Sequence, residues 1–508
     1  MERSTNIKHK IDFLLLSNDA LSRHPTQTII KPKYKKKKCS GCNKIRTPSI
    51  ENHQICYTCN QAKKRIIPSG NKVIDDFIKY VQTNSGKRNG KMIFVPYGKF
   101  ENIELIGEGG FSKIYKATWV DCRISNSGTP IYPIQNKSVT VALKKLNNSN
   151  NITSKELNEL KMFYLYSLNG NYKDIYAGYI GHVNVYYGIT QDPTTQDLIF
   201  IMPYYKSDLA RYITKDFYNN IWYNKLHKLG DIISGLVKIH IGNIIHRDLH
   251  SGNILLRGAN HLYHDAKICD LGTSKSAIEL TDNNDDNEIY GIIPYVAPEV
   301  LQGKKYSRAS DIYSYGMIMW EVMVGRRPFW DRKHDTELII EICDGLRPPI
   351  ITNAPEGYID LMKECWHPEP EKRPKADEVL KEIEEVRKAE IRLKHNETKI
   401  IKSSDIGPVT TNNPDAIYKS RYLSSMIKSA ASTRSLRSQS ITSELGKRKF
   451  EDNQFENNFI NGESIKKIKV IEDKNYEYAT KELELDIDIN SNRFNDEEYI
   501  TTEINFDI

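Results

Sequence analysis

Residues 246–253, in the order His-Arg-Asp-Leu-His-Ser-Gly-Asn, place an acid, two imidazoles and an amide in one short stretch of chain. Apolar residues precede this stretch at 244–245 and follow it at 254–256. A polar tip between apolar flanks predicts a loop that is held by core on both sides, which is how rigid scaffolds present catalytic groups. Asp248 and Asn253 are therefore the first candidates for catalysis.

A second group of chemically capable residues lies near the N-terminus. Four of the eight cysteines form two C-x-x-C pairs, Cys39 with Cys42 and Cys56 with Cys59. Two such knuckles can supply the four thiolates of a tetrahedral zinc site, and the metal would fold a segment with little apolar core. The alternative interpretation is ordinary reduced thiols in a disordered segment, and we favour zinc.

The remaining cysteines are scattered singly, which is not a disulfide framework and predicts a reducing, intracellular location, cytoplasmic or nuclear. The chain carries a net charge of +8, with a concentrated basic run at residues 31–38. That run could contact nucleic acid, anionic lipid or an acidic partner, or act as a nuclear address. We favour a solvated charge run, and nucleic-acid contact through residues 31–59 stays the alternative. No apolar run approaches the length of a membrane span.

Further along the chain, elements suited to holding phosphates precede the polar loop. Residues 100–106 predict a strand that leads into the glycine-rich stretch 107–112. Glycines in such a turn let backbone N–H groups approach phosphate oxygens without interference from Cβ atoms. A plain hairpin turn is the alternative interpretation of this stretch taken alone.

The β-branched run at residues 139–143 predicts a strand that ends at Lys144, whose ammonium needs a carboxylate partner. A predicted helix that begins near residue 154 offers two candidates, Glu159 and Glu156. Taken alone, Lys144 could equally be a charge that keeps an edge strand soluble.

Several further motifs follow in a fixed order. They are an apolar strand with a polar exit at 198–208, Asp-Leu-Gly at 270–272, Ala-Pro-Glu at 297–299, the helix that starts at Asp311, and Cys-Trp-His-Pro at 365–368 with Arg373. Together with His-Arg-Asp-Leu-x-x-x-Asn, this set resembles the eukaryotic protein kinase domain, and the tyrosine-kinase-like group most closely. The resemblance covers residues 99–390.

The resemblance implies an α+β, bilobal protein kinase fold, with a small β-rich N-lobe and a larger helical C-lobe. It also implies ATP and Mg²⁺ as reactant and cofactor and protein hydroxyls as substrates. By this resemblance the catalytic residues are Asp248, Lys144, Asn253 and Asp270, and Asn253 and Asp270 are the Mg²⁺ ligands. The implied nucleotide-binding residues are Ile106, Gly107, Glu108, Gly109, Gly110, Phe111, Ser112, Ile114, Ala142, Lys144, Glu159, Met202 and Leu255.

Two positions depart from the pattern of serine/threonine kinases. Position 250 is His where that pattern has Lys, and position 292 is Ile where it has Thr. The signatures of tyrosine kinases are absent as well. We predict an ATP-dependent protein kinase that phosphorylates Ser/Thr in intracellular signalling. The alternatives are a tyrosine or dual-specificity kinase and a kinase-fold scaffold without catalysis.

The predicted organisation has five parts. They are a flexible N-terminus at 1–30, a basic segment with the cysteine knuckle at 31–66, a helical lead-in at 67–98, the kinase domain at 99–390 and a disordered tail at 391–508. The tail is rich in Asn, Ser, Lys, Glu and Asp and too poor in apolar residues to build a core of its own. We expect partners to dock on such tails.

Overall fold

The computed structural model describes residues 37–49, 51, 54–84, 91–125, 130–168, 181–215, 217–257, 266–276, 288–393 and 398–436. All of them belong to one compact unit, residues 1–441. The predicted N-terminus at 1–30, most of the basic run and the tail beyond 436 lie outside the described residues.

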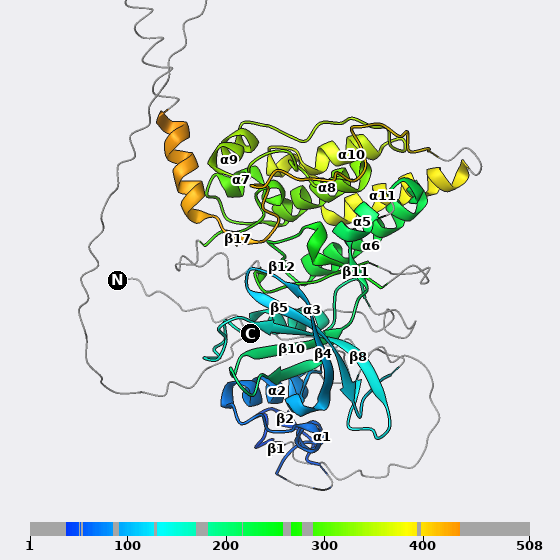
Figure 1. Cartoon of the computed structure of the whole chain (residues 1–508). Coiled ribbons are helices and arrows are strands. Elements are labelled where there is room, and N and C mark those ends of the chain that lie inside the picture. The colour runs from blue at the N-terminus through cyan, green and yellow to red at the C-terminus, as the bar shows by residue number, and fades with distance from the viewer. Residues whose placement is uncertain are drawn as a thin grey trace, which may run out of the picture. The chain divides into compact units, whose positions relative to one another are not determined.

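The N-lobe is built on a six-stranded sheet with the strand order β3-β9-β10-β8-β5-β4 (Figure 1). Its strands are β3 (Ile93–Phe94), β4 (Phe100–Glu108), β5 (Ser112–Val120), β8 (Ser138–Leu146), β9 (Gly188–Gln191) and β10 (Leu198–Pro203). The short hairpin of β6 (Arg123–Ile124) and β7 (Pro130–Ile131) lies between β5 and β8, where the sequence has an insertion. Helix α3 (Asn158–Leu168) follows β8 and buries Leu160, Phe163 and Tyr164.

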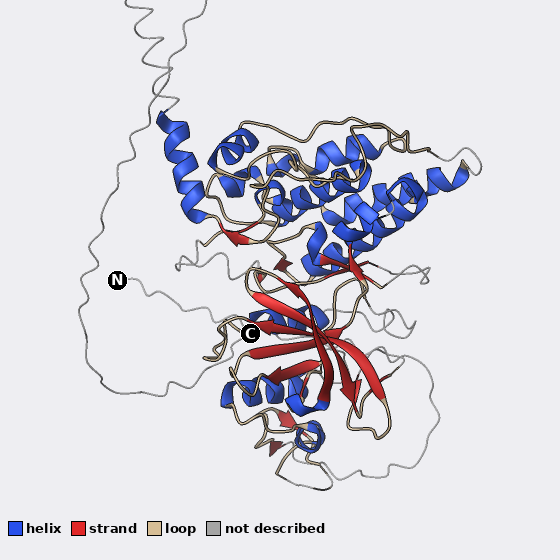
Figure 2. Cartoon of the chain, in the orientation of Figure 1, coloured by secondary structure: helices blue, strands red, loops and turns tan. Residues whose placement is uncertain are grey.

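The C-lobe is mainly helical (Figure 2). Its helices are α5 (Leu209–Lys215), α6 (Trp222–Ile241), α7 (Pro298–Leu301), α8 (Arg308–Val324), α9 (Thr336–Cys343), α10 (Tyr358–Cys365) and α11 (Ala376–Arg392). The apolar residues 226, 229, 233 and 236 line one face of α6, as their helical spacing predicts, and all are buried. Helix α8 starts at a capping box between Ser307 and Ser310 and ends at Gly325, where φ is +78°.

Short strands hold the polar loop between the lobes. They are β11 (Ser207–Asp208), β12 (Ile244–Ile245), β13 (Ile254–Leu256), β14 (Ala266–Ile268) and β15 (Lys275–Ser276). Strand β12 pairs with β15, and β13 lies between β11 and β14. The loop 246–253 is therefore fixed by pairing at both ends, which agrees with its predicted apolar flanks.

Residues before the kinase domain pack on the N-lobe. The strands β1 (Lys37–Lys38) and β2 (Ile45–Arg46) pair with each other, and α1 (Tyr57–Arg65) lies against α2 (Lys72–Asn84). Helix α2 buries Ile74, Phe77, Ile78 and Val81, in the predicted helical spacing. Strand β3 then joins the main sheet beside β9 in parallel.

Residues 398–436, which we call the strap, lie along the C-lobe. The strap contains β17 (Arg421–Tyr422), which pairs with β16 (Tyr290–Gly291), and a helix over residues 424–436. It belongs to residues 391–508, which we predicted to be a disordered tail, and that prediction is wrong for the strap. Its apolar residues Ile406, Leu423 and Ile427 are instead buried with the core of the kinase domain. Within the described ranges, no helix is both long and apolar enough to cross a membrane.

Candidate active site and cysteine cluster

An ion cluster joins strand β8, helix α3 and the Asp-Leu-Gly turn. The ammonium of Lys144 donates to both carboxylate oxygens of Glu159, at 3.0 and 2.8 Å, and lies 2.9 Å from Oδ1 of Asp270. Lys144 and Glu159 are buried. Glu156, the alternative partner, instead accepts hydrogen bonds from Thr153. Glu159 is therefore the carboxylate that holds Lys144.

Two carboxylates keep Lys144 charged although it is buried. Burial lowers the pKa of the ammonium, but the charges of Asp270 and Glu159 outweigh it and raise that pKa above its ordinary value. For Asp270, burial acts to raise the pKa, and the adjacent Lys144 more than offsets it, so the carboxyl has a lowered pKa. An ionised Asp270 is the form that could bind a cation.

Asp311 of α8 fixes the backbone of the polar loop. Its two carboxylate oxygens accept from the backbone N–H groups of His246, at 2.9 Å, and Arg247, at 3.0 Å. His240 lies 2.9 Å from the same carboxylate. These bonds offset the burial of a charge and hold the turn that carries Asp248.

A buried ion pair braces the C-lobe below this loop. The guanidinium of Arg373 donates two bonds to Glu299, at 2.8 and 2.7 Å, and both side chains are buried. This pair lies away from the reacting groups.

Asp248 lies at the centre of the loop. The Asn253 amide donates to the backbone oxygen of Asp248 at 2.9 Å, which ties the two ends of the loop together. Burial raises the pKa of the Asp248 carboxyl to about 6, a hydrogen bond from Ser420 opposes the shift, and the nearby Asp270 adds to it. Oδ2 of Asp248 accepts that bond from the Ser420 hydroxyl at 2.6 Å.

His250 lies beside the same carboxylate. Burial lowers the pKa of His250 to about 3, so the ring is neutral at pH 7. Nδ1 accepts from the backbone N–H of Gly252 at 3.1 Å, which leaves the proton on Nε2, 3.8 Å from Oδ1 of Asp248. Ile292 is buried. A neutral imidazole thus stands where the serine/threonine pattern has a lysine.

Most of the predicted nucleotide-binding residues lie on the strands of the N-lobe. The strands β4 and β5 carry Ile106, Gly107, Glu108, Ser112 and Ile114, and their connecting turn carries Gly109, Gly110 and Phe111. Ala142 and Lys144 lie on β8, Met202 on β10 and Leu255 on β13. Met202 pairs with Ala142 across the sheet. Phe111 is half exposed and packs edge-on to Tyr290, with the ring centroids 5.5 Å apart.

Two residues that the motifs do not mark also support the cluster. The hydroxyl of Tyr186 donates to Oε1 of Glu159. The amide of Asn158 donates to the backbone oxygens of Gly272, at 2.9 Å, and Ser274, at 3.0 Å, and so ties α3 to the Asp-Leu-Gly turn. Asn158 directly precedes Glu159 at the start of the helix, so its position in the sequence could have indicated that it lies near the cluster. Nothing in the local sequence of Tyr186 indicates its contact.

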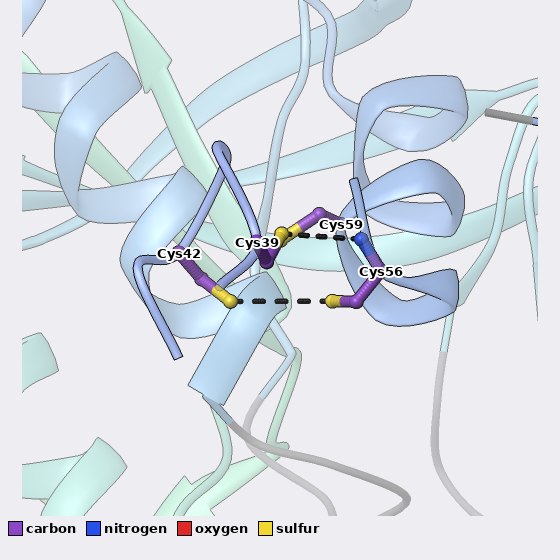
Figure 3. Close-up of side chains that lie close together, drawn as sticks. All are labelled: Cys39, Cys42, Cys56 and Cys59. Atoms are coloured by element: carbon purple, nitrogen blue, oxygen red, sulfur yellow. Dashed lines mark hydrogen bonds between the residues drawn. The ribbon is translucent and has the colours of Figure 1, made fainter. Parts of the chain in front are cut away.

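The four paired cysteines converge on one point (Figure 3). Their sulfur atoms all lie within 4.8 Å of one another, and those of Cys42 and Cys56 are 4.0 Å apart. Zinc–sulfur bonds of about 2.3 Å in a tetrahedron place the sulfurs roughly 3.8 Å apart, so the four thiols fit this metal.

The sulfur of Cys39 is held by two backbone donors. It accepts from the backbone N–H groups of Cys56, at 3.1 Å, and Gly41, at 3.3 Å. Burial acts to raise the pKa of Cys39, but these backbone bonds outweigh it and lower the pKa to about 6.

The bilobal fold, the clustered Lys144, Glu159 and Asp270, and the braced loop define the class of the protein. Residues 100–383, more than half of the chain, match the family model of the protein tyrosine and serine/threonine kinases. The chain belongs to this family. The predicted kinase fold is confirmed.

Curated relatives agree with this assignment. A Dictyostelium discoideum protein named "Probable serine/threonine-protein kinase pats1" is 29% identical over 294 residues, which is 56% of this chain and 8% of that relative. Mitogen-activated protein kinase kinase kinase 13-A of Xenopus laevis is 33% identical over 153 residues, 30% of this chain and 15% of the relative. The similarity to this second protein fits the predicted tyrosine-kinase-like group. The chain spans only a small part of the length of these relatives.

Proposed function

We propose that this protein transfers the γ-phosphoryl group of ATP to serine or threonine hydroxyls of other proteins and acts in intracellular signalling. The observation that carries the proposal is the convergence of Lys144, Glu159, Asp270 and the Asp248–Asn253 loop at one site. Phosphoryl transfer requires positioning and charge neutralisation more than covalent catalysis, and this constellation supplies both.

Each residue has a role in this proposal. Bound Mg²⁺–ATP supplies the phosphoryl group and the cations that neutralise it. Asp248 orients the acceptor hydroxyl and takes its proton, while Asn253 and Asp270 hold the metal. Lys144, held by Glu159, contacts the α- and β-phosphates, and the turn at 107–112 covers them with backbone N–H groups.

The preference for serine or threonine has two supports. The relatives described above include one whose name denotes a serine/threonine kinase. The Asp248 carboxylate also accepts a hydrogen bond from a serine hydroxyl, that of Ser420, at 2.6 Å. The phenolic oxygen of a tyrosine extends several ångströms farther from its backbone, so tyrosine on a strand at the same depth would overshoot the carboxylate.

We infer that the four cysteines bind a structural zinc ion. The cluster uses all four thiols, so no ligand position is left for a substrate, which is typical of structural sites. The metal would fix residues 37–65 against α2.

The test compares wild-type protein with Asp248→Asn in Mg²⁺–ATP and a generic protein substrate, followed by phosphoamino-acid analysis. We expect incorporation by the variant to be lower by about 10²–10⁴-fold, the usual contribution of a positioned base. Asp360→Asn, an exposed position on α10, is the matched control and should keep wild-type activity. Equal background incorporation by all three proteins would favour a non-catalytic scaffold. Phosphotyrosine as the sole product would overturn the serine/threonine assignment.

A further inference from the structure

The middle of the strap lies across the site at which a kinase substrate would have to bind. Before this point, the strap is anchored on the C-lobe by backbone contacts. The backbone N–H of His334 donates to the oxygen of Asp415 at 3.0 Å, and the hydroxyl of Tyr418 donates to the oxygen of Pro328 at 3.0 Å. After it, Leu423 and Ile427 are buried, and Arg434 forms an ion pair with Asp344 at 2.6 Å.

Between these anchors, the strap pairs with the activation segment, residues 270–299. Strand β17 is antiparallel to β16, with Tyr422 opposite Tyr290 and Arg421 opposite Gly291. The backbone N–H of Leu423 donates to the oxygen of Ile289 at 2.8 Å, which extends the ladder. A peptide that adds a strand to an exposed edge is a recurrent mode of peptide recognition, in which main-chain bonds give affinity and alternate side chains give specificity.

The pairing places Ser420 in the position of a phosphoacceptor. Its hydroxyl donates to Asp248 Oδ2 at 2.6 Å. Its backbone oxygen lies close to the glycine-rich turn. A Cβ atom added at Gly110 would be only 2.9 Å from this oxygen. The acceptor hydroxyl, the proposed base and the proposed phosphate-covering turn are therefore in contact within one chain.

We propose that Ser420 is a site of autophosphorylation within the same molecule, and that the strap occupies the substrate groove until this reaction takes place. This inference rests on the proposed kinase activity. It extends that activity by naming a modification site and a control of access.

The reaction is the proposed phosphoryl transfer with Ser420 as the acceptor. The Oγ atom of Ser420 forms a bond to the γ-phosphorus of Mg²⁺–ATP as the bond to the β,γ-bridging oxygen breaks. The hydroxyl proton passes to the Asp248 carboxylate, and ADP leaves with the electron pair of the broken bond. No oxidant or other reactant is needed.

The product would disfavour the strap in its present position. A phosphoserine carries about −1.5 to −2 charges at pH 7. At position 420 it would face Asp248 and, beyond it, Asp270. Like charges at this distance in a partly buried site repel, so phosphorylation should release residues 418–424 and open the groove to other substrates.

In the experiment, the full chain is first treated with phosphatase and then supplied with Mg²⁺–ATP. Mass spectrometry measures the phosphate on Ser420 over time. Because the reaction is intramolecular, we expect the first-order rate constant to stay unchanged when the protein is diluted tenfold. Ser432→Ala, on the exposed side of the 424–436 helix, is the matched control and should give the same time course. A tagged Asp248→Asn chain mixed with wild type should remain unmodified at Ser420.

Each other result counts against the inference. Phosphorylation of a generic substrate with Ser420 left bare would overturn it while leaving the proposed function intact. Modification of the tagged Asp248→Asn chain at Ser420, or a rate constant that falls tenfold on dilution, would replace the intramolecular reaction with one between molecules. Absence of phosphate on both Ser420 and the generic substrate would overturn the inference together with the proposed kinase activity.

Discussion

Lys225 of α6 is a buried cation that takes no part in the proposed chemistry. Its ammonium lies 3.9 Å from the ring centroid of Phe217 and 5.1 Å from that of Trp222, and it has no hydrogen-bond partner among the described residues. Among the described residues that line the same small cavity, the other charged side chain is Lys228, so none of them supplies a carboxylate to compensate the charge. Burial lowers the pKa of Lys225 to about 7.

We predict that Lys225→Met stabilises the protein at pH 7. In the unfolded chain Lys225 binds its proton up to a pH near the ordinary lysine pKa of 10.5, whereas the folded chain releases it near 7. The contribution of Lys225 to the free energy of unfolding of the wild type therefore rises with pH between these two values. Methionine removes the buried charge, and we expect a gain of about 2–4 kcal/mol at pH 7, because contact with the two rings offsets part of the desolvation.

The measurement is the difference in the free energy of unfolding between Lys225→Met and wild type at pH 7 and pH 9.5. The advantage of the variant should shrink at the higher pH. Lys363→Met, at an exposed position of α10, controls for the loss of a lysine and should change stability by less than about 0.5 kcal/mol. If the variant were more stable by the same amount at both values of pH, Lys225 would not be a buried cation with a lowered pKa.

Among single residues, the sequence marks those that belong to local motifs. Lys144, Glu159 and Asp270 could be chosen because each stands in a short, ordered pattern, and the structure brings them into contact. Tyr186 and Ser420 could not be chosen in this way. Their partners, Glu159 and Asp248, are far away in the sequence, and a lone hydroxyl has no pattern that indicates where it will bind.

At the scale of elements, the cysteine cluster is linked to the active site through two helices. Cys56 caps the start of helix α1, which packs on α2. Helix α2 contacts α3 through Tyr80 and Tyr164, whose rings meet edge-on at 5.8 Å. Because α3 carries Glu159, these contacts would connect a metal in the cysteine cluster with the helix that holds the partner of Lys144.

We predict that removing the metal ligands loosens this N-terminal module. In Cys42→Ser with Cys56→Ser, the zinc content measured by elemental analysis should fall from about one ion per chain to near zero. Backbone amides in residues 54–84 should exchange faster with deuterium, because metal binding supplies the folding energy of such segments. The effect on kinase activity should be smaller, since α3 also packs on the sheet.

Cys343→Ser is the matched control, because Cys343 is half-buried like Cys42 but lies outside the cluster. It should keep the zinc content and the exchange rates of the wild type. Wild-type protein that purifies without zinc, and exchanges at the same rate with and without a chelator, would contradict the structural metal.

The elements themselves were largely predictable. The β-branched run before Lys144 forms β8, and the apolar spacing at residues 74–81 forms α2. Where α2 docks was not predictable, because an amphipathic stripe specifies that a face is buried and not against which element. The first turn of α3 also starts later than predicted, at Asn158, because Glu156 bonds back to Thr153.

At the scale of the whole kinase unit, the strap brings residues 398–436 across the C-lobe to Asp248. Composition predicts a disordered tail here because the stretch cannot build a core of its own, but the strap is ordered on the kinase domain. Its few apolar residues suffice because they are buried in a surface that the kinase domain already provides. Docking of this kind is a long-range property that local sequence does not encode.

We predict that Leu423→Asp opens the groove. Leu423 is fully buried and lies three residues after Ser420, so an aspartate there would detach β17 from β16. The lost burial is worth about 2 kcal/mol, which corresponds to about thirtyfold in the docking equilibrium. We expect the KM for an external peptide to fall by up to that factor, because the fraction of molecules with a free groove limits the apparent affinity.

Leu436→Asp introduces the same charge at an exposed position of the strap helix, where 66% of the residue is accessible. Its KM should equal that of the wild type, so any fall seen only with Leu423→Asp comes from detachment and not from added charge. The melting temperatures of both variants separate detachment from unfolding of the kinase domain. An unchanged KM in Leu423→Asp, with phosphate still appearing on Ser420, would mean that external peptides bind elsewhere and that the strap serves the enzyme as a substrate but not as a gate.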